Sequence, residues 1–181
     1  MSVSAPRIRA ATPEDASALA RLRYEFRASI GVPDEPREGF VERCVAWMTP
    51  RLMPDARWRA WVAEGPEGIV GAVWIGLIEK MPNPIAEPEE HGYLTNFYVK
   101  PTVRGTGTGT ALLDSALGWC AERGVHAVML WPTERSRALY ERHGFAAPSS
   151  LMERIVTGDA APWPSPASDD RPTADNRGNG G

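Results

Sequence analysis

The sequence predicts an α/β fold of the mixed α+β kind, with a central mixed and mostly antiparallel sheet and helices on both faces. Two observations lead to this prediction. An alternating segment, 58–64, and a longer, nearly all apolar one, 69–79, flank the turn residues 65–68 (Gly-Pro-Glu-Gly), a spacing typical of an antiparallel hairpin. Residues 92–131 then read as a strand, a helix and a strand, an order that requires one parallel pair with a right-handed crossover.

The first third of the chain predicts one short strand and two helices. Residues 7–10 read as an opening strand, after which Thr12 and Pro13 supply the N-cap and the first residue of a helix. Apolar residues at helical spacing continue that helix. A second helix is predicted from about 36 to 48, and Pro50 is expected to end it.

The rest of the chain predicts one long run of elements and then a tail. In chain order we first expect a loop at 81–91, a strand at 92–99, a glycine-rich turn and an amphipathic helix closed by Gly124. A short buried strand at 125–131 and a helix at 133–143 closed by Gly144 follow. The last strand segments are expected at Phe145 and 151–156. Residues 1–156 are therefore predicted to form one domain. The segment 157–181, rich in proline, glycine and aspartate, is predicted to be a disordered tail.

The composition predicts a globular protein without an obvious macromolecular partner. Of its 181 residues, 43% are hydrophobic and 24% are charged, and the net charge of −3 gives no basic footprint for nucleic acid. Cys44 and Cys120 stand too far apart for a disulfide framework or a zinc pattern, so no metal is expected. The N-terminus lacks the apolar core of a signal peptide, and the longest apolar run, 69–78, is too short to cross a membrane. We therefore expect a cytoplasmic protein.

The turn between strand 92–99 and the helix after it is the most informative stretch. Glycine and threonine alternate there from 105 to 110, directly after Arg104. Glycine permits left-handed dihedrals, so several backbone N–H groups can point to one side, and the start of the helix adds its positive dipole end. Together these features predict a site for a pyrophosphate.

Two nucleotide-binding patterns fit this turn less well. The Walker pattern requires Gly-Lys-Ser/Thr before the helix, and Thr110-Ala111 stands there instead. The Rossmann pattern, started at Gly105, requires a small residue where Thr110 stands, and its loop should follow the first strand of the domain. Here three earlier strands and two helices come before it. A tight turn alone would need only one glycine.

The turn resembles the signature of the GNAT superfamily of N-acetyltransferases, Arg/Gln-x-x-Gly-x-Gly/Ala, with Arg104, Gly107 and Gly109 in the signature positions. Residues 140–145 resemble the family's Tyr-x-x-x-Gly-Phe motif, and the likeness extends over 7–156. It implies a GNAT-like fold and an enzyme that transfers an acetyl group from acetyl-CoA to a primary amine by direct attack, without a covalent intermediate.

The resemblance also implies which residues hold acetyl-CoA, the co-substrate. The backbone of strand 92–99 would bind the pantetheine arm as an added strand would, and the glycine turn would bind the pyrophosphate. The implied coenzyme-binding residues are Phe97, Tyr98, Val99, Arg104, Gly105, Thr106, Gly107, Thr108, Gly109, Thr110, Thr133 and Ser136.

Tyr140 is implied as the catalytic acid that protonates the departing thiolate. Tyrosine and a thiol have comparable intrinsic pKa values, so the transfer is feasible; packing beside Phe145 is the alternative role. The family often has an acidic general base in the fourth strand, where Thr95 and Asn96 stand here. Water, a neutral amine, or a group from the preceding loop could replace it, the candidates being Glu87, Glu89, Glu90 and His91.

The seven tryptophans divide into two predicted groups. Trp58, Trp61 and Trp74 lie in the hairpin strands and are expected to fill its core. Trp47 and Trp131 stand near element ends, where a binding cleft would be lined, and for Trp131 a position in the core is the alternative.

The acceptor and the assembly are left open by the sequence. The acceptor is a small-molecule or peptide amine, and the acidic net charge favours a small cationic one. The sequence does not distinguish an acetyl donor from a donor of a longer acyl group. It also leaves the oligomeric state open, with a homodimer as one option. The alternative function is a non-catalytic coenzyme-A-binding module of the same fold, favoured by Thr95 and Asn96 and disfavoured by Tyr140.

Overall fold

The computed structural model describes residues 5–31, 34–147 and 152. The chain divides into two compact units, residues 1–130 and 131–181. Among the described residues, the first unit holds five strands and three α-helices, and the second holds helix α4.

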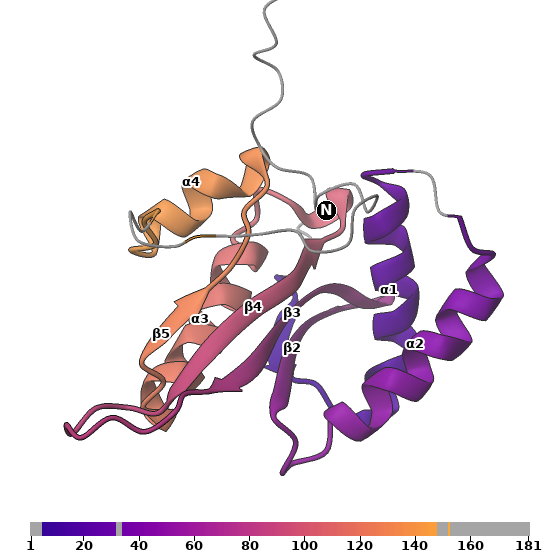
Figure 1. The fold of residues 1–181 in the computed structure, drawn as a ribbon. Coiled ribbons are helices and arrows are strands. Elements are labelled where there is room, and N and C mark those ends of the chain that lie inside the picture. The colour runs from indigo at the N-terminus through magenta and orange to yellow at the C-terminus, as the bar shows by residue number, and fades with distance from the viewer. Residues whose placement is uncertain (1–4, 32–33, 148–151, 153–181) are drawn as a thin grey trace, which may run out of the picture. The chain divides into compact units, whose positions relative to one another are not determined.

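A five-stranded sheet forms the centre of the first unit, with its strands in sequence order (Figure 1). Every neighbouring pair is antiparallel except β4 and β5, which are parallel and are joined through α3. This confirms the predicted mixed, mostly antiparallel sheet with one parallel connection. The strands are β1 (Arg7–Ala10), β2 (Trp58–Gly65), β3 (Gly68–Glu79), β4 (Glu90–Val99) and β5 (Ala127–Met129).

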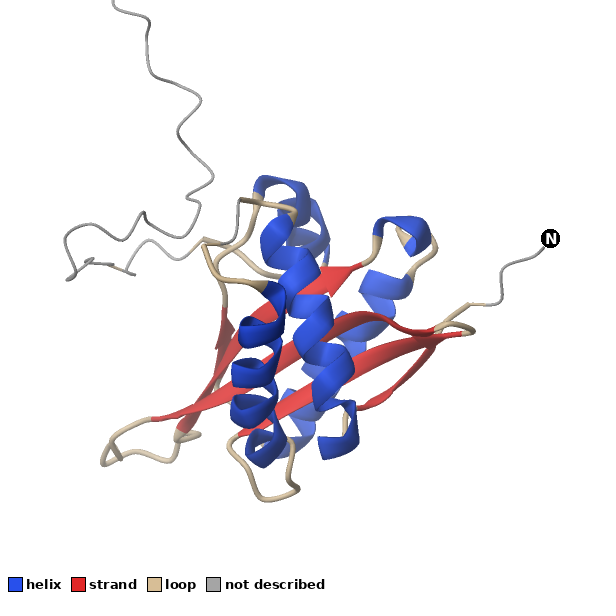
Figure 2. Cartoon of the chain, turned by 90° about the vertical axis from the view of Figure 1, so that its right-hand side faces the viewer, coloured by secondary structure: helices blue, strands red, loops and turns tan. Residues whose placement is uncertain are grey.

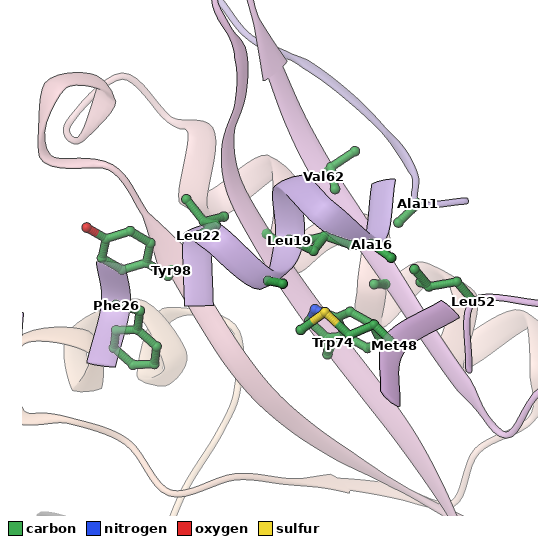
Figure 3. Close-up of a cluster of buried hydrophobic side chains, with 13 residues drawn as sticks. Ala11, Ala16, Leu19, Leu22, Phe26, Met48, Leu52, Val62, Trp74 and Tyr98 are labelled. Atoms are coloured by element: carbon green, nitrogen blue, oxygen red, sulfur yellow. The ribbon is translucent and has the colours of Figure 1, made fainter. Parts of the chain in front are cut away.

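Helices cover both faces of this sheet, as predicted. Helices α1 (Ala16–Ala28) and α2 (Arg37–Arg51) lie on one face and α3 (Thr108–Arg123) on the other; Figure 2 looks onto the α1 and α2 side. Because both faces are covered, alternate residues of the hairpin strands are buried on opposite sides. Val62 and Trp74 belong to the core beneath α1 and α2 (Figure 3).

The core on the α1 and α2 side contains the apolar residues of α1 that recur at helical spacing in the sequence. Leu19, Leu22 and Phe26 of α1 are buried, and the Phe26 ring stacks on Tyr98 of β4 at 5.3 Å between centroids (Figure 3). On the α3 side, Trp61 of β2 meets Trp119 of α3 edge-on at 5.7 Å. Strands β2 and β4 are thereby fixed between helices.

One partly buried ion cluster connects the start of the chain to the hairpin. Arg9 of β1 donates hydrogen bonds to both oxygens of Asp15, at 2.7 and 2.9 Å, and to Glu64 of β2 at 3.1 Å. Asp15 also accepts the backbone N–H of Thr12 at 2.8 Å, which closes the capping box at the 3-10 turn (η1, Pro13–Asp15) before α1. The predicted N-cap at Thr12 is thus confirmed.

Three predicted element boundaries were wrong. Helix α2 continues past Pro50, because a proline in the last turn removes only one hydrogen bond; the Leu52 N–H still reaches the Met48 carbonyl at 3.1 Å. Strand β4 begins two residues earlier than predicted, at Glu90. Strand β5 is shorter than 125–131 and only half-buried, because it pairs with β4 alone.

Two predictions concern residues that the structure does not describe. The predicted strand at 151–156, apart from Met152, and the predicted tail at 157–181 lie outside the described residues. Within the described part of the chain, no helix has the length and apolar character needed to span a bilayer.

Candidate active site

The glycine turn joins β4 to α3 through two left-handed glycines. Strand β4 ends at Val99, a short 3-10 turn (η2, Pro101–Val103) follows, and Gly105 and Gly107 have φ values of +76° and +85°. No protein atom lies within 4 Å of the position a Cβ would take at either glycine. The requirement for glycine here is therefore conformational and does not come from close packing.

The N-terminus of α3 presents backbone donors that nothing in the helix can satisfy. Gly107 is the N-cap and offers no side-chain cap, and the first intrahelical bond runs from the Ala111 N–H to the Gly107 carbonyl at 3.0 Å. The N–H groups of Thr108, Gly109 and Thr110 therefore have no acceptor within the helix. This is the arrangement that binds phosphate groups at helix N-termini.

Side chains brace the turn from within. The Thr106 hydroxyl lies 2.8 Å from both the Val103 carbonyl, to which it donates, and the Thr108 hydroxyl. Thr108 is 4% exposed, so it supports the turn from the protein side. The Arg104 Nε donates to the Val99 carbonyl at 2.9 Å, which holds the exposed guanidinium beside the turn.

Strand β4 is irregular just before the turn. Ala72 and Trp74 of β3 pair with Tyr98 and Thr95, so two residues of β4 stand opposite one of β3, and Asn96 has a φ of +49°. This is a β-bulge, with asparagine in the left-handed region that it tolerates best after glycine. The β4–β5 pairs end at Tyr93, so the two strands part before the bulge.

A cavity of about 520 Å³ opens on the α1 and α2 side of this bulge, a size that suits a small-molecule ligand. Its floor is the sheet and its wall is mostly the face of α2. It is lined by Arg23, Phe40, Arg43, Cys44, Trp47, Met48, Trp58, Trp74, Tyr93, Thr95 and Asn96.

Three tryptophans form the apolar side of the cavity. The Trp47 ring lies 5.2 Å from Trp58 and 6.0 Å from Trp74, and Trp58 lies 6.4 Å from Trp74. Trp58 can lie flat on the sheet because its cross-strand partner is Gly76, where a Cβ would come within 2.8 Å of the ring. Trp58, assigned to the core from the sequence, packs against that core with a half-buried ring and also lines the cavity. Trp47 lines it as predicted, and Trp61 and Trp74 are buried as predicted.

The polar side of the cavity is basic. The Arg23 Nη1 donates to the Asn96 Oδ1 at 3.0 Å, and burial lowers the pKa of the Arg23 guanidinium. Arg43 is exposed and forms an ion pair with Glu35. None of the described residues that line the cavity is an aspartate or a glutamate.

Arg23 was missed in the sequence, although the sequence held a signal for it. It follows Leu22 and precedes Phe26 on the face of α1 that is otherwise apolar and buried. A charged residue on the buried face of an amphipathic helix is rare unless it is paired or serves a ligand. The bulge at Asn96 had no comparable signal, because it depends on the register between β3 and β4.

In the second unit, Thr133 and Ser136 cap helix α4 (Glu134–Arg142). The Thr133 N–H donates to the Ser136 Oγ at 3.0 Å, and the two hydroxyls lie 2.9 Å apart. This capping box accounts for both residue types. The helix ends at Arg142 with His143 as its C-cap, and Gly144, with φ +82°, follows as predicted.

Tyr140 is buried on α4, with 6% of its surface exposed, and its ring meets Phe145 edge-on at 5.5 Å. Burial raises the pKa of its hydroxyl above the ordinary value. The side chain is protonated at neutral pH, as a proton donor must be, but the raised pKa makes it a weaker acid than a free tyrosine, so the comparable acidity of tyrosine and a thiol does not carry over to the buried hydroxyl. The predicted contact with Phe145 is confirmed, while the catalytic role stays a prediction.

The four candidate bases of the 81–91 segment are not among the residues lining the cavity. Glu87 pairs with Lys80 at 3.1 Å and Glu90 with Arg123 at 2.7 Å, and hydrogen bonds, from Asn83 and Arg123 respectively, lower the pKa of each carboxyl. Carboxylates held in this way are weaker bases. Among the described residues no cluster of three or more His, Cys, Asp or Glu could hold a metal ion.

Comparison with known proteins connects these features to acetyl transfer. The model of the acetyltransferase (GNAT) family matches residues 22–145, which include the turn, the bulge, the cavity and α4. An aminoglycoside N(6')-acetyltransferase type 1 of Stenotrophomonas maltophilia is 32% identical over 125 residues, covering 68% of this chain and 73% of that protein.

Solved structures show the same fold. A predicted acetyltransferase of Clostridium acetobutylicum, crystallised with acetyl-CoA, is 26% identical, with a TM-score of 0.70 and coverage of 82% of this chain and 95% of that one. A GCN5-related N-acetyltransferase of Ralstonia eutropha JMP134 is 27% identical, with a TM-score of 0.68 and coverage of 83% and 99%.

Proposed function

Because the chain belongs to the acetyltransferase (GNAT) family, we propose that it transfers the acetyl group of acetyl-CoA directly to a primary amine held in the cavity beneath α1 and α2. The observation that carries this proposal is the order of features along one strand. Strand β4 contributes cavity-lining residues up to Asn96, bulges there, and then leads into the glycine turn and the N-terminus of α3.

The coenzyme would lie along the end of β4 and over the turn. The free N–H groups at the start of α3 and the guanidinium of Arg104 would bind the pyrophosphate, since both favour negative charge. The backbone beyond the last β4–β5 pair would bind the pantetheine amides as a strand edge does. The proposed set is Phe97, Tyr98, Val99, Arg104, Gly105, Thr106, Gly107, Thr108, Gly109 and Thr110, with Thr133 and Ser136 from the second unit.

In the proposed reaction, the amine nitrogen attacks the thioester carbonyl carbon, the new C–N bond forms, and the C–S bond breaks. The amine arrives neutral or first gives its extra proton to water. After the attack the nitrogen gives one proton to water, the leaving thiolate takes one from Tyr140, and the tyrosinate regains a proton from solvent. Water is the proposed base because none of the described cavity-lining residues is an aspartate or a glutamate. Cytoplasmic location and the lack of a metal requirement stay predictions from the sequence.

The coenzyme site can be tested apart from turnover. Arg104→Ala should weaken acetyl-CoA binding by about 1.5–3 kcal/mol, the range for a hydrogen bond to a charged group, as measured by calorimetry. Arg21→Ala removes an exposed arginine from α1 and should leave the affinity unchanged. Equal affinity of both variants would place the pyrophosphate elsewhere. Release of free thiol from acetyl-CoA with amines, above the rate without amine, separates an enzyme from a non-catalytic binding module.

A further inference from the structure

The cavity combines features that restrict the chemistry of its occupant. One side is made of tryptophan rings, and the opposite side holds the guanidinium of Arg23 next to the bulge of β4. The curated relative acts on an aminoglycoside, which carries several positive charges, yet none of the described cavity-lining residues is acidic. In that lining a polycation would meet Arg23 and Arg43, and the carboxylate beside them, that of Glu35, is already paired with Arg43.

Arg23 is a charged cavity-lining residue without a counter-ion among the described residues. Its one hydrogen bond among the described residues goes to the neutral Asn96 amide, and it forms no ion pair with a described carboxylate. A guanidinium has five N–H donors and stays charged in proteins, and a partly buried charge without a counter-ion is costly. A carboxylate from a ligand would supply that counter-ion in a bidentate geometry.

The aromatic side could in principle attract a cation through its ring faces. Arg51, however, already lies over the Trp47 ring, with its guanidinium carbon 4.1 Å from the centroid. The tryptophans are thus better placed to pack against an apolar or aromatic group, which also fits the burial of Trp74 at 1% exposure.

On these grounds we propose that the acceptor is an aromatic or bulky apolar amine with a carboxylate close to its reacting nitrogen, as in an aromatic α-amino acid. This rests on the proposed function. Arg23 would bind the carboxylate, and the tryptophan rings would enclose the side chain. Since Asn96 precedes the first proposed coenzyme-binding residue, Phe97, a carboxylate on Arg23 would bring the neighbouring amine to the place where the thioester is proposed to lie.

Matched ligands test the proposal on the full chain. Binding is followed by quenching of tryptophan fluorescence, since Trp47, Trp58 and Trp74 line the cavity. N-acetyl-L-phenylalanine, the product of the proposed reaction, should bind roughly tenfold or more tightly than N-acetylphenethylamine, which lacks only the carboxylate. In thiol-release assays, L-phenylalanine should exceed phenethylamine in kcat/KM by a similar factor and should exceed kanamycin.

Two variants locate the effect. In Arg23→Gln, the affinity ratio of the two acetylated ligands and the kcat/KM ratio of phenylalanine to phenethylamine should both fall toward one. In Arg21→Gln, on the exposed side of the same helix, both ratios should persist. Turnover of phenethylamine or kanamycin at least as fast as that of phenylalanine would overturn the inference and leave the proposed function intact. A carboxylate preference that is the same in Arg23→Gln as in the parent protein would also overturn the inference. Carboxylate-dependent binding without turnover of any amine would support the inference and reject the proposed function.

Discussion

Replacing Gly107 with alanine separates the conformational role of the glycine turn from packing. Gly107 has φ +85° and ψ −5°, a left-handed conformation that costs an L-residue about 1–2 kcal/mol. No heavy atom lies within 4 Å of the new Cβ, so the structure adds no steric cost to the backbone term. We expect Gly107→Ala to lower Tm by roughly 2–8 °C, at about 2–4 °C per kcal/mol for a chain of this length.

The same helix provides a control with the opposite expected sign. Gly118 lies in the interior of α3, is exposed, and also has no atom within 4 Å of a Cβ. Its backbone is helical, so Gly118→Ala should stabilise the protein by about 0.5–1 kcal/mol. The two variants add the same methyl group to the same helix, and only the dihedral angles at the site differ.

Thermal unfolding without coenzyme measures the change in stability of each variant, and calorimetry with acetyl-CoA measures the change in its affinity. A turn that relaxes to accommodate alanine redirects N–H groups at the start of α3, and loss of one charge-assisted hydrogen bond raises Kd roughly tenfold or more. Gly118→Ala should leave Kd unchanged. Stabilisation of Gly107→Ala equal to that of Gly118→Ala would refute the backbone argument, and an unchanged Kd for Gly107→Ala would refute the assignment of the pyrophosphate site.

The remaining predictions concern the acid, the cavity and the ion cluster. Tyr140→Phe should lower kcat about 10²–10⁴-fold with little change in the KM for acetyl-CoA; an effect smaller than tenfold, with Tm lowered, would assign the tyrosine to packing. Gly76→Ala places a Cβ 2.8 Å from the Trp58 ring, so it should raise the KM of the acceptor while the Kd of acetyl-CoA stays constant; an unchanged acceptor KM would remove Trp58 from the site. The hydrogen bonds from Arg9 lower the pKa of Asp15 below its ordinary 3.8, so Asp15 contributes stability that is fully present above that pH and is lost as pH falls through the lowered value. Urea unfolding should therefore show Asp15→Asn less stable than the parent at pH 7 and the difference shrinking below pH 3.8; a difference independent of pH would contradict the linkage.

Local chemistry explains why most elements could be predicted from the sequence. The capping box at Thr12, the left-handed glycine that closes α3 at Gly124, and the hairpin turn at 66–67 each depend on a few consecutive residues. The glycine turn is also local: its donors come from adjacent residues, so one stretch of sequence contains the whole proposed phosphate site. The errors at the ends of β4 and β5 fell where pairing partners distant in sequence set the boundary. The error at Pro50 was local, because a proline in the last turn of a helix removes only one hydrogen bond.

The cavity was decided by tertiary structure alone. Arg23 and Asn96 are 73 positions apart, and they meet only because α1 packs against the bulge of β4. Trp58 lines the cavity because of the way α2 crosses the sheet. The residue pattern of β2 alone does not encode that crossing. The charge around the cavity is likewise a tertiary property. Net charge sums over the whole surface, whereas a ligand responds to the charges within a few ångströms, such as the guanidinium groups that the fold brings to one cavity. The cationic acceptor that net charge favoured stays a prediction.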